Sequence, residues 1–566
     1  MTDVNKRIAD IIAAAEPIGP AVDAAAIRAI IHNAEAEAAA ITTDGTGDAC
    51  FGDVDDGGFA DQALDELAMR EDLRNVAAKA VSRFLAFNAL TDLGNAERFA
   101  RRHREKVIYA PERGWLVWDG KRWSPDGADE IVLKAAHDTA RSIQEEAAAI
   151  RGTDDDIVIK VKADGEEIRL SDQIASWGRA SESAQKLQAM PKHATAYIAV
   201  GASRLDADPW KINVQNGTLT VNRTPGDDDV VSFAPHDPMD LITKLAPVAY
   251  DPEATCPTYD RFLEEVLPDP AVRRFMHQWA GYSLTGDTSE QRLCFFYGKG
   301  KNGKSTLVDA WGAVAGDYGE TVPIETFLNQ GRGRNAGAAT PDLAMLPGVR
   351  FLRTSEPEKG AKLAEALIKL VTGGEPIQAR HLNRDYFKFR PSFKLTMSGN
   401  YRPAIDGTDE GIWRRVTLIP WLVTVAKPDR NLPAKLDMEA SGILNRMLDG
   451  LRDYVDNGLI VPQGIAEATA DYRDDSDPLG RFLRLAVGRI EGERVQSSTL
   501  HRVFIALAKS AGEREWSPKG LAMALKERGF RSMHSNGMWW LDTCLTPAGR
   551  DLDHSSSPHP HEEADG

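Results

Sequence analysis

"FFYGKGKNGKST", residues 295–306, is the stretch that decides the fold of this 566-residue chain. An apolar run passes into a loop rich in glycine and lysine, and "STLVDAWGAVAG" (305–316) continues with helical spacing. Gly298, Gly303, Lys304 and Ser305 fit G-x-x-x-x-G-K-[ST], a pattern that needs a strand before it and a helix after it. Because both elements are predicted, we expect the loop to hold a nucleoside triphosphate.

Each residue type in this loop has a chemical reason to be there. Glycines let backbone N–H groups wrap phosphates, and the start of a helix adds a dipole that favours an anion. Lys304 is expected to reach the β and γ phosphates, and Ser305 to coordinate Mg²⁺. The predicted nucleotide-binding residues are Gly298, Lys299, Gly300, Lys301, Asn302, Gly303, Lys304, Ser305 and Thr306.

Further strands and helices follow the loop. "VRFLRT" (349–354) and "FKLTMSGN" (393–400) are apolar strand patterns separated by a helical one, "KLAEALIKLVTG" (362–373). Alternating strands and helices predict a parallel, doubly wound α/β domain. Glu356, with Glu358 as the weaker candidate, follows the first strand, where an acid would order Mg²⁺ and the attacking water. Asn400 ends the other strand and is a candidate contact to the γ-phosphate, although the acids could be solvated and Asn400 could cap a turn.

Two adjacent arginines, Arg414 and Arg415, precede another strand in "DGTDEGIWRRVTLIP" (406–420). An arginine supplied across a subunit interface stabilises charge during phosphoryl transfer. We expect one of the two to act in this way, and their spacing does not say which. A salt bridge to Asp409 or Glu410 is the alternative.

Residues 373–394, "GGEPIQARHLNRDYFKFRPSFK", alternate around "HLNRD" as a hairpin does. Positive side chains on a protruding hairpin suit a phosphodiester backbone, and Tyr386 and Phe387 could stack on bases. A solvated sheet edge would have the same pattern. The basic residues of this segment are Arg380, His381, Arg384, Lys388, Arg390 and Lys394.

The composition, with 42% hydrophobic and 27% charged residues, is that of a water-soluble globular protein with several domains. The net charge of −17 is unevenly placed, since residues 1–70 carry 14 acidic residues against 4 basic ones. Basic clusters such as "RFARRHREK" (98–106) stand out elsewhere, and local charge decides binding to a polyanion. Four scattered cysteines, no secretory signal and no membrane span predict a cytoplasmic protein.

Several blocks of this sequence, in order, resemble the superfamily 3 helicase domain of phage and plasmid primase-helicases, relatives of the poxvirus primase-helicase. The blocks are "GYSLTGDTSEQRLCFFYGKGKNGKST" (281–306), "RFLRTSEPEKGAKLAEALIKLVTGGEPIQARHLNRD" (350–385) and "GTDEGIWRRVTLIPW" (407–421). "YAPERGWLVWDGKRW" and "LDADPWKINVQNGTLTV" are similar to the segment that precedes the helicase in this family.

The resemblance implies an ATP- and Mg²⁺-dependent hexameric helicase with an AAA+-like core that moves 3′ to 5′ on single-stranded DNA and unwinds forked DNA. By the family's pattern Lys304 and Ser305 match the phosphate loop, Glu356 the acidic motif, Asn400 the sensor, and Arg414 and Arg415 the finger region. The segment 377–390 matches a hairpin that such rings point into their channel. The metal would be held by Ser305 and Glu356.

The C-terminal part resembles the family's appended domain. "RVQSSTLHRVFIALAKSAG" and "EWSPKGLAMALKERGF" are predicted as helices and "RSMHSNGMWWLD" as a wing. In a winged helix the second helix enters the major groove, which makes Lys519, Lys526 and Arg528 candidate DNA contacts. A helical lid that only packs on the ring is the alternative.

The expected organisation has six parts, within an α/β chain that has an α+β region before the helicase core and a winged-helix-like domain after it. These are an acidic, partly disordered segment (1–70), the α+β region (71–250), a helical collar for oligomerisation (251–290), the helicase core (291–475), the winged-helix-like domain (476–545) and a disordered acidic tail (546–566).

Residues 1–70 are too short and too acidic for the primase module of many relatives. We therefore expect a replication helicase that relies on a separate primase. Loading at an origin is a further expected role. Two alternatives stay open: a primase-helicase with an unrecognised priming site, and a nucleotide-switched origin-binding or assembly protein that does not unwind DNA.

Overall fold

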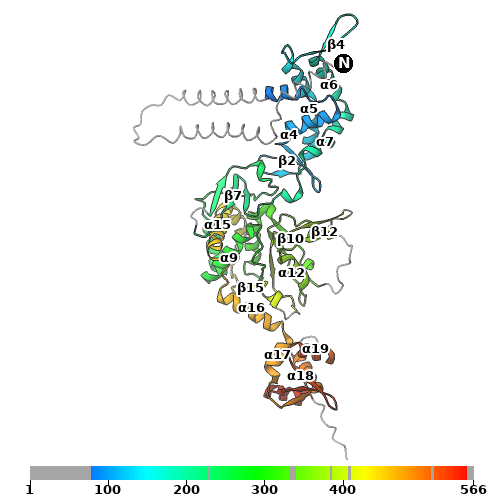
Figure 1. Ribbon diagram of the computed structural model, residues 1–566. Coiled ribbons are helices and arrows are strands. Elements are labelled where there is room, and N and C mark those ends of the chain that lie inside the picture. The colour runs from blue at the N-terminus through cyan, green and yellow to red at the C-terminus, as the bar shows by residue number, and fades with distance from the viewer. Residues whose placement is uncertain are drawn as a thin grey trace, which may run out of the picture. The chain divides into compact units, whose positions relative to one another are not determined.

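The computed structural model describes residues 78–226, 230–329, 340–380, 382, 385–405, 410–510 and 515–556. They form two compact units, one reaching Asp119 and continuing over Trp123–Arg204, the other made of Gly120–Arg122 and the chain from Leu205 onward (Figure 1). The expected segment 1–70 and the tail beyond residue 556 lie outside the described residues. Within the described part, no helix combines the length and the apolar character needed to span a membrane.

The first unit consists of helices around a small antiparallel sheet and a separate hairpin, so it mixes helices and strands as the expected α+β region does. Fully buried Phe99, Ala136 and Met190 belong to its main core. Its helices are α4 (Asp92–His103), α5 (Ala128–Ile150), α6 (Leu170–Ser181) and α7 (Ala184–Ile198). Its strands are β1 (Val107–Ala110), β2 (Gly114–Trp118), β3 (Trp123–Ser124), β4 (Val158–Val161) and β5 (Glu167–Arg169).

The second unit contains a five-stranded sheet in the order β10-β11-β14-β9-β15, and every neighbouring pair is parallel. The parallel α/β domain predicted from the strand–helix alternation is therefore present. The short edge strand β10 has no counterpart among the predicted strands. The bounds of the strands are β9 (Leu293–Tyr297), β10 (Gly319–Val322), β11 (Phe351–Thr354), β14 (Lys394–Gly399) and β15 (Val416–Pro420).

Apolar side chains on both faces of this sheet explain why its strands are nearly continuous apolar runs. On β9, Cys294 and Phe296 pack in one hydrophobic cluster, while Leu293 and Phe295 pack in another. The first cluster includes α10 (Lys304–Ala315) and the second includes α12 (Glu365–Thr372). The sheet is thus covered on both sides by buried apolar layers.

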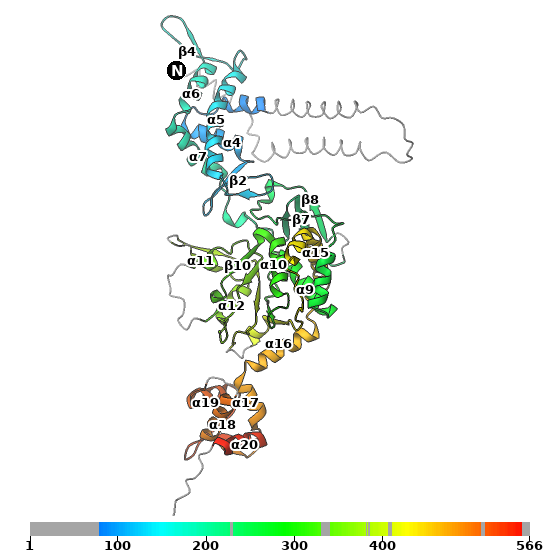
Figure 2. The ribbon, with the colours of Figure 1, turned by 180° about the vertical axis from the view of Figure 1, so that it is seen from behind.

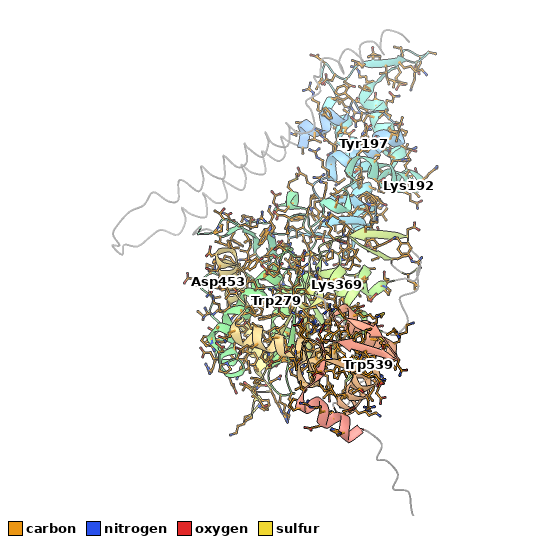
Figure 3. The ribbon with its side chains drawn as sticks, turned by 60° about the horizontal axis from the view of Figure 1, so that its bottom comes forward. Lys192, Tyr197, Trp279, Lys369, Asp453 and Trp539 are labelled. Carbon is orange, nitrogen blue, oxygen red and sulfur yellow. The ribbon has the colours of Figure 1, made fainter. Side chains whose placement is uncertain are left out.

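Two long helices, α9 (Pro270–Leu284) and α15 (Ala440–Asn457), lie side by side (Figures 1 and 2). Glycines make this close approach possible: a Cβ on Gly281 would lie 2.2 Å from the Met447 carbonyl oxygen, and one on Gly450 would lie 2.0 Å from that of His277. Trp279 of α9, labelled in Figure 3, is fully buried, and its Nε1 donates to Thr396 Oγ1 at 2.9 Å. The helices expected over 251–290 therefore pack into the core of the sheet domain.

The strands after Arg204 belong with the second unit, so the region expected as one domain over 71–250 is divided. The reason is a set of buried contacts: Arg350 Nη1 donates to the Lys211 and Leu284 carbonyls, each at 2.8 Å, and the Asn213 backbone N–H donates to Tyr318 Oη. These strands form a three-stranded antiparallel sheet of β6 (Lys211–Val214), β7 (Gly217–Val221) and β8 (Val231–Ala234).

The remaining elements of this unit before residue 476 are helices and one hairpin. They are α8 (Pro257–Val266), α11 (Pro341–Ala344), β12 (Ile377–Arg380), β13 (Tyr386–Phe389), α13 (Glu410–Trp413), α14 (Leu432–Met438) and α16 (Gln463–Asp475).

The C-terminal part has the two predicted helices and the predicted hairpin, β18–β19, to which β17 adds a third strand. Its helices are α17 (Pro478–Ala486), α18 (Ser497–Ser510), α19 (Pro518–Glu527) and α20 (Pro547–Ser556), and its strands are β16 (Val487–Gly488), β17 (Arg494–Gln496), β18 (Ser532–His534), β19 (Met538–Leu541) and β20 (Cys544–Leu545).

The boundary expected at residue 545 was wrong, because α20 is an ordered helix that packs on α17 and α18. Asp553 accepts from Arg502 Nε at 2.8 Å, and Leu552 lies against the apolar cluster of this part. The polar composition of this segment does not indicate either contact, so the helix was not predicted.

Candidate functional site

The loop between β9 and α10 has the shape that its glycines predict. Gly303 has φ 83°, a left-handed conformation, and a Cβ on it would lie 2.8 Å from the Phe262 ring. A Cβ on Gly298 would lie 2.2 Å from the Trp421 carbonyl oxygen. Larger residues would therefore strain the turn or displace β15. Because α10 begins at Lys304, the backbone N–H groups at its start have no carbonyl partner within the helix.

Lys304 is buried, and its ammonium is held inside the loop. Nζ donates to the Gly298 carbonyl oxygen at 2.6 Å, to Asn302 Oδ1 at 3.1 Å and to Asn400 Oδ1 at 3.4 Å. Burial lowers the pKa of Lys304, and the negative charge of Glu356 opposes that shift. A lysine and the start of a helix directed into one loop make an anion-binding site.

Asn302 has a positioning role that the sequence pattern did not reveal. Its amide nitrogen donates to the Lys299 carbonyl oxygen at 2.8 Å, while its amide oxygen accepts from Lys304 Nζ. The side chain therefore ties the loop backbone to the lysine. In the motif G-x-x-x-x-G-K-[ST], Asn302 occupies one of the x positions, which allow any residue. The motif therefore does not single out Asn302.

Glu356 and Asn400 follow adjacent strands, β11 and β14, and meet beside the loop. The Asn400 backbone N–H donates to Glu356 Oε1 at 2.5 Å, and the Asn400 side chain accepts from Lys304. The structure thus brings together three predicted site residues that are up to 96 positions apart. Glu358 is also exposed, two residues further along the same loop.

The oxygen donors at this edge of the sheet fit a hard divalent cation. Glu356 and Ser305 are both exposed, so a carboxylate and a hydroxyl are available near the anion-binding loop. Mg²⁺ prefers oxygen ligands and keeps several waters, which makes one or two protein ligands sufficient.

Arg414 and Arg415 have opposite environments. Arg415 is buried, and its Nε donates to Thr372 Oγ1 at 3.0 Å and its Nη1 to the Gly411 carbonyl oxygen. Arg414 is exposed and donates to Gln291 Oε1 at 2.8 Å. Glu410, offered as the alternative salt-bridge partner, pairs instead with Arg473 at 2.7 Å. Asp409, the other alternative, lies outside the described residues. Only Arg414 has a side chain that a neighbouring molecule could reach.

The basic segment 377–390 forms the predicted antiparallel hairpin, β12–β13. Lys388, Arg390 and Tyr386 are exposed, and the Arg380 guanidinium lies 4.9 Å from the centre of the Tyr386 ring. Phe387 packs against the core, so Tyr386 is the exposed one of the two aromatic residues. His381 and Arg384 lie outside the described residues.

Lys394 was wrongly grouped with the basic residues of this hairpin. It begins β14, is 2% exposed and donates from Nζ to the carbonyl oxygens of Asp287, Ser392 and Thr285. Burial lowers its pKa well below the ordinary value. The residue pattern does not indicate this, because the basic run continues past the residue where the hairpin ends and the core strand begins.

The candidate DNA contacts of the C-terminal part lie on or next to α19. Lys519 and Lys526 are exposed. Arg528 is also exposed but pairs with Asp477 at 2.6 Å, so a DNA phosphate would have to compete with that carboxylate.

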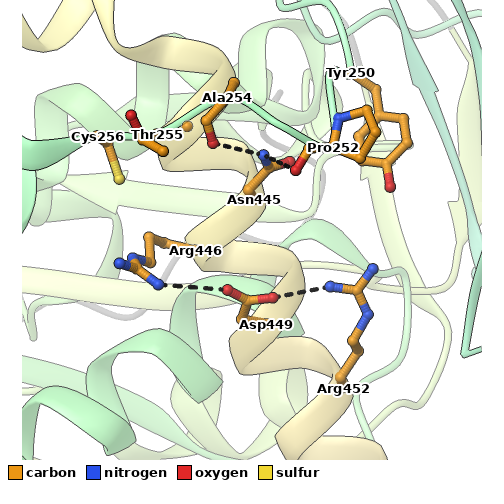
Figure 4. Close-up of a pocket in the computed structure, with 10 residues that line it drawn as sticks. Tyr250, Pro252, Ala254, Thr255, Cys256, Asn445, Arg446, Asp449 and Arg452 are labelled. Atoms are coloured by element: carbon orange, nitrogen blue, oxygen red, sulfur yellow. Dashed lines mark hydrogen bonds and ion pairs between the residues drawn. The ribbon is translucent and has the colours of Figure 1, made fainter. Parts of the chain in front are cut away.

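A hollow of about 240 Å³ on α15 lies apart from the loop in sequence and has paired charges (Figure 4). Asp449 pairs with Arg446 and Arg452, and Arg446 also pairs with Asp260. Asn445 donates to the Ala254 carbonyl oxygen at 2.9 Å. The charged side chains that line this hollow are thus paired with carboxylates or guanidinium groups of the same unit.

Comparisons with known proteins find similarity to proteins named as helicases or primases of large DNA viruses. The family described as "D5 N terminal like" matches residues 96–268, a range that crosses the boundary between the two units. A protein named as a putative helicase of Acanthamoeba polyphaga mimivirus is 26% identical over 310 residues, 51% of this chain and 32% of its own length. A putative helicase of Frog virus 3 is 28% identical over 282 residues, 46% of this chain and 27% of its own.

A protein named as a putative primase of African swine fever virus (strain Badajoz 1971 Vero-adapted) is 24% identical over 213 residues, 38% of this chain and 22% of its own length. The matched parts thus span a third or less of these relatives. Among solved structures, the apo NrS-1 C-terminal region covers 58% of this chain and 94% of its own, with 10% identity and a TM-score of 0.34.

Proposed function

We propose that this chain, a relative of the helicases and primases of large DNA viruses, is an ATP-dependent DNA helicase of phage or plasmid replication. The observation that carries the proposal is the meeting of Lys304, Glu356 and Asn400 at the ends of three parallel strands, beside a glycine loop that opens a helix. Ligands of parallel α/β sheets bind at this edge, outside the carboxyl ends of the strands.

In this proposal the loop N–H groups and Lys304 hold the triphosphate, and Asn302 keeps the ammonium in place. Mg²⁺, when bound by Ser305 and Glu356, would neutralise phosphate charge. Glu356 orients the attacking water, and Asn400, bonded to both Glu356 and Lys304, contacts the γ-phosphate or that water.

Arg414 is the proposed finger, supplied by one subunit to the nucleotide of its neighbour. Its exposure, against the burial of Arg415, supports this choice. The AAA+-like assignment, the hexamer and movement from 3′ to 5′ rest on the family resemblance.

DNA is proposed to contact the β12–β13 hairpin through Arg380, Lys388 and Tyr386. An exposed aromatic ring beside exposed cations suits a single strand, because every base can stack and every phosphate is charged. Lys519 and Lys526 are proposed as a second contact, within a domain that we assign as winged-helix-like.

The test is ATP-dependent strand displacement on a forked duplex with a 3′ single-stranded tail, comparing wild type with Lys304→Ala. Displacement by the wild type and its loss in the variant would support the motor. ATP hydrolysis without displacement would favour the nucleotide-switched assembly protein instead, and Glu356→Gln would then leave DNA-bound assembly intact.

Priming is a second candidate function, favoured by the name of the African swine fever virus relatives. The matched part covers only 22% of those proteins, so their priming activity does not transfer with the alignment. Incorporation of labelled ribonucleotides on a single-stranded template would establish it here, and its absence would support reliance on a separate primase.

A further inference from the structure

The first unit has an open groove of about 520 Å³ lined by residues of α4, α5 and the helical residues 78–85. It is formed partly by "RFARRHREK", the basic cluster that the proposed motor does not use. Two acidic residues, Asp138 and Glu145, line it, against four permanently positive ones. The positive residues are Arg101, Arg102, Lys106 and Arg141.

Beside the groove, two guanidinium groups share a single buried carboxylate, so positive charge is in excess there. Glu146 is fully buried and accepts from Arg98 Nε at 2.8 Å and from Arg102 Nη2 at 3.1 Å. One carboxylate therefore serves two guanidinium groups. The other bonds of Arg98 go to neutral carbonyl oxygens, such as that of Ala89 at 2.9 Å. Because an uncompensated charge is costly when partly buried, this excess favours an anion in the groove.

Of the two arginines that share Glu146, Arg102 is the one that lines the groove. Its Nε is buried and has no hydrogen-bond partner among the described residues. Burial is the largest cause of the lowered pKa of the neighbouring His103, about 4, to which the positive charges of Lys106 and Arg102 add and which Asp138 opposes. Among the described residues that line the groove, positive side chains outnumber acidic ones, although the whole chain is acidic.

Lys106 and Arg141 are two further cations that line the groove. Both are exposed, and neither forms an ion pair within the described part of the chain. Arg141 is three residues from Asp138 and four from Glu145 on α5, yet it pairs with neither. Their charges are therefore available to a ligand.

An exposed aromatic ring lies beside Arg101, one of the arginines that line the groove. Phe84 is 56% exposed, and the Arg101 guanidinium lies 5.1 Å from the centre of its ring. An aromatic ring would add nothing to the binding of inorganic phosphate. A flat apolar face next to a cationic groove is what a nucleic-acid strand needs, since its bases stack while its phosphates are neutralised.

We propose that this groove binds a single nucleic-acid strand, with phosphates on Lys106, Arg102 and Arg141 and a base on Phe84. The site is additional to the motor and depends on the proposed function only in taking DNA as the strand. It would hold the strand independently of ATP.

The test is binding of a fluorescent 20-nucleotide oligothymidylate to the full chain without ATP, by anisotropy at several salt concentrations. The double variant Lys106→Ala/Arg141→Ala should bind about tenfold more weakly. Loss of two phosphate contacts should reduce the magnitude of the slope of log K against log salt by about 1.4. Phe84→Ala should weaken binding about fivefold or more without changing the slope, because stacking releases no counterions.

The matched control, Lys160→Ala/Lys192→Ala, removes two exposed cations of the same unit that do not line the groove. It should retain wild-type affinity and slope. Measurement in a Lys388→Ala background removes part of the hairpin's contribution. Equal affinity and slope in the groove variant and the wild type would overturn the proposal. Weaker binding by the groove variant together with unchanged affinity of Phe84→Ala would overturn the assignment of a strand whose base stacks on that ring.

These outcomes are separate from those of the motor. A chain without ATP hydrolysis that still shows the groove effect would refute the helicase alone. Intact ATP-driven unwinding by the groove variant, with unchanged strand binding, would refute the groove alone.

Discussion

Glu356 and Asn400 are joined directly: the backbone N–H of Asn400 donates to a carboxylate oxygen of Glu356. The bond connects the ends of β11 and β14, and the Asn400 side chain extends the connection to Lys304. Two hydrogen bonds thus connect the phosphate loop, which follows β9, to the end of its neighbour β14 and, through it, to the end of β11.

Lys304→Ala should lower the rate of ATP hydrolysis by about 100-fold or more, because a charge that stabilises the transferred phosphoryl group is lost. Lys427→Ala removes an exposed lysine from the same unit and should behave as wild type. Steady-state phosphate release measures both. A Lys304→Ala chain that hydrolyses ATP at the wild-type rate would contradict the assignment of the loop.

Arg414→Ala should lower kcat for ATP hydrolysis by about 10³-fold with little change in stability. Because the finger acts on a neighbour's nucleotide, mixing this variant with Lys304→Ala should recover part of the activity. Mixed assemblies can contain one intact site, formed from Lys304 of one subunit and Arg414 of the next. No recovery in mixtures would argue against a finger acting between subunits.

Arg415→Ala should instead destabilise the fold by about 2 kcal/mol or more, because Thr372 Oγ1 and the Gly411 carbonyl oxygen lose a buried donor. Thermal denaturation beside Arg414→Ala separates the two roles. If Arg415→Ala keeps the wild-type transition but loses ATP hydrolysis, the roles of the two arginines are reversed.

Gly450→Ala should destabilise the α9–α15 contact by about 1–3 kcal/mol, because the new Cβ would lie 2.0 Å from the His277 carbonyl oxygen. Gly464→Ala is the control: it lies in α16 with open space around the added Cβ and should be neutral or stabilise by up to about 1 kcal/mol. Chemical denaturation of both variants measures the difference. Equal stability would mean that the helices can separate without cost.

His277 should make the second unit sensitive to acid. Burial, aided by the nearby positive charge of Arg446 and opposed by Asp260 and Asp449, lowers its pKa from 6.5 to about 4. The unfolded chain therefore takes up the proton first, so stability is full above pH 6.5 and falls as the pH decreases toward 4. The loss is at most about 1.4 kcal/mol for each pH unit.

Denaturation of wild type and His277→Phe at pH 7.5, 6 and 5 isolates this contribution. The difference between the two proteins should change over that interval. Parallel pH dependences would show that His277 does not titrate with a lowered pKa.

Local patterns predicted most of the α/β core. The strands around 293–297, 351–354 and 394–399 and the intervening helices follow from apolar runs and helical spacing, which are properties of neighbouring residues. The same is true of the β12–β13 hairpin. Edge strand β10 and helix α20 were missed, since their short or polar sequences become ordered only through partners distant in the chain.

What the sequence by itself determined is the glycine loop, the strand before it, the helix after it and the candidates that follow the neighbouring strands. A short motif with a fixed spacing is enough for that, because the backbone geometry it requires is local. Only the tertiary structure decided that Arg414 is exposed while Arg415 is buried, that Lys394 belongs to the core, and that Glu146 holds two arginines. These outcomes depend on burial and on partners tens to more than a hundred residues away, which no pattern of neighbouring residues encodes.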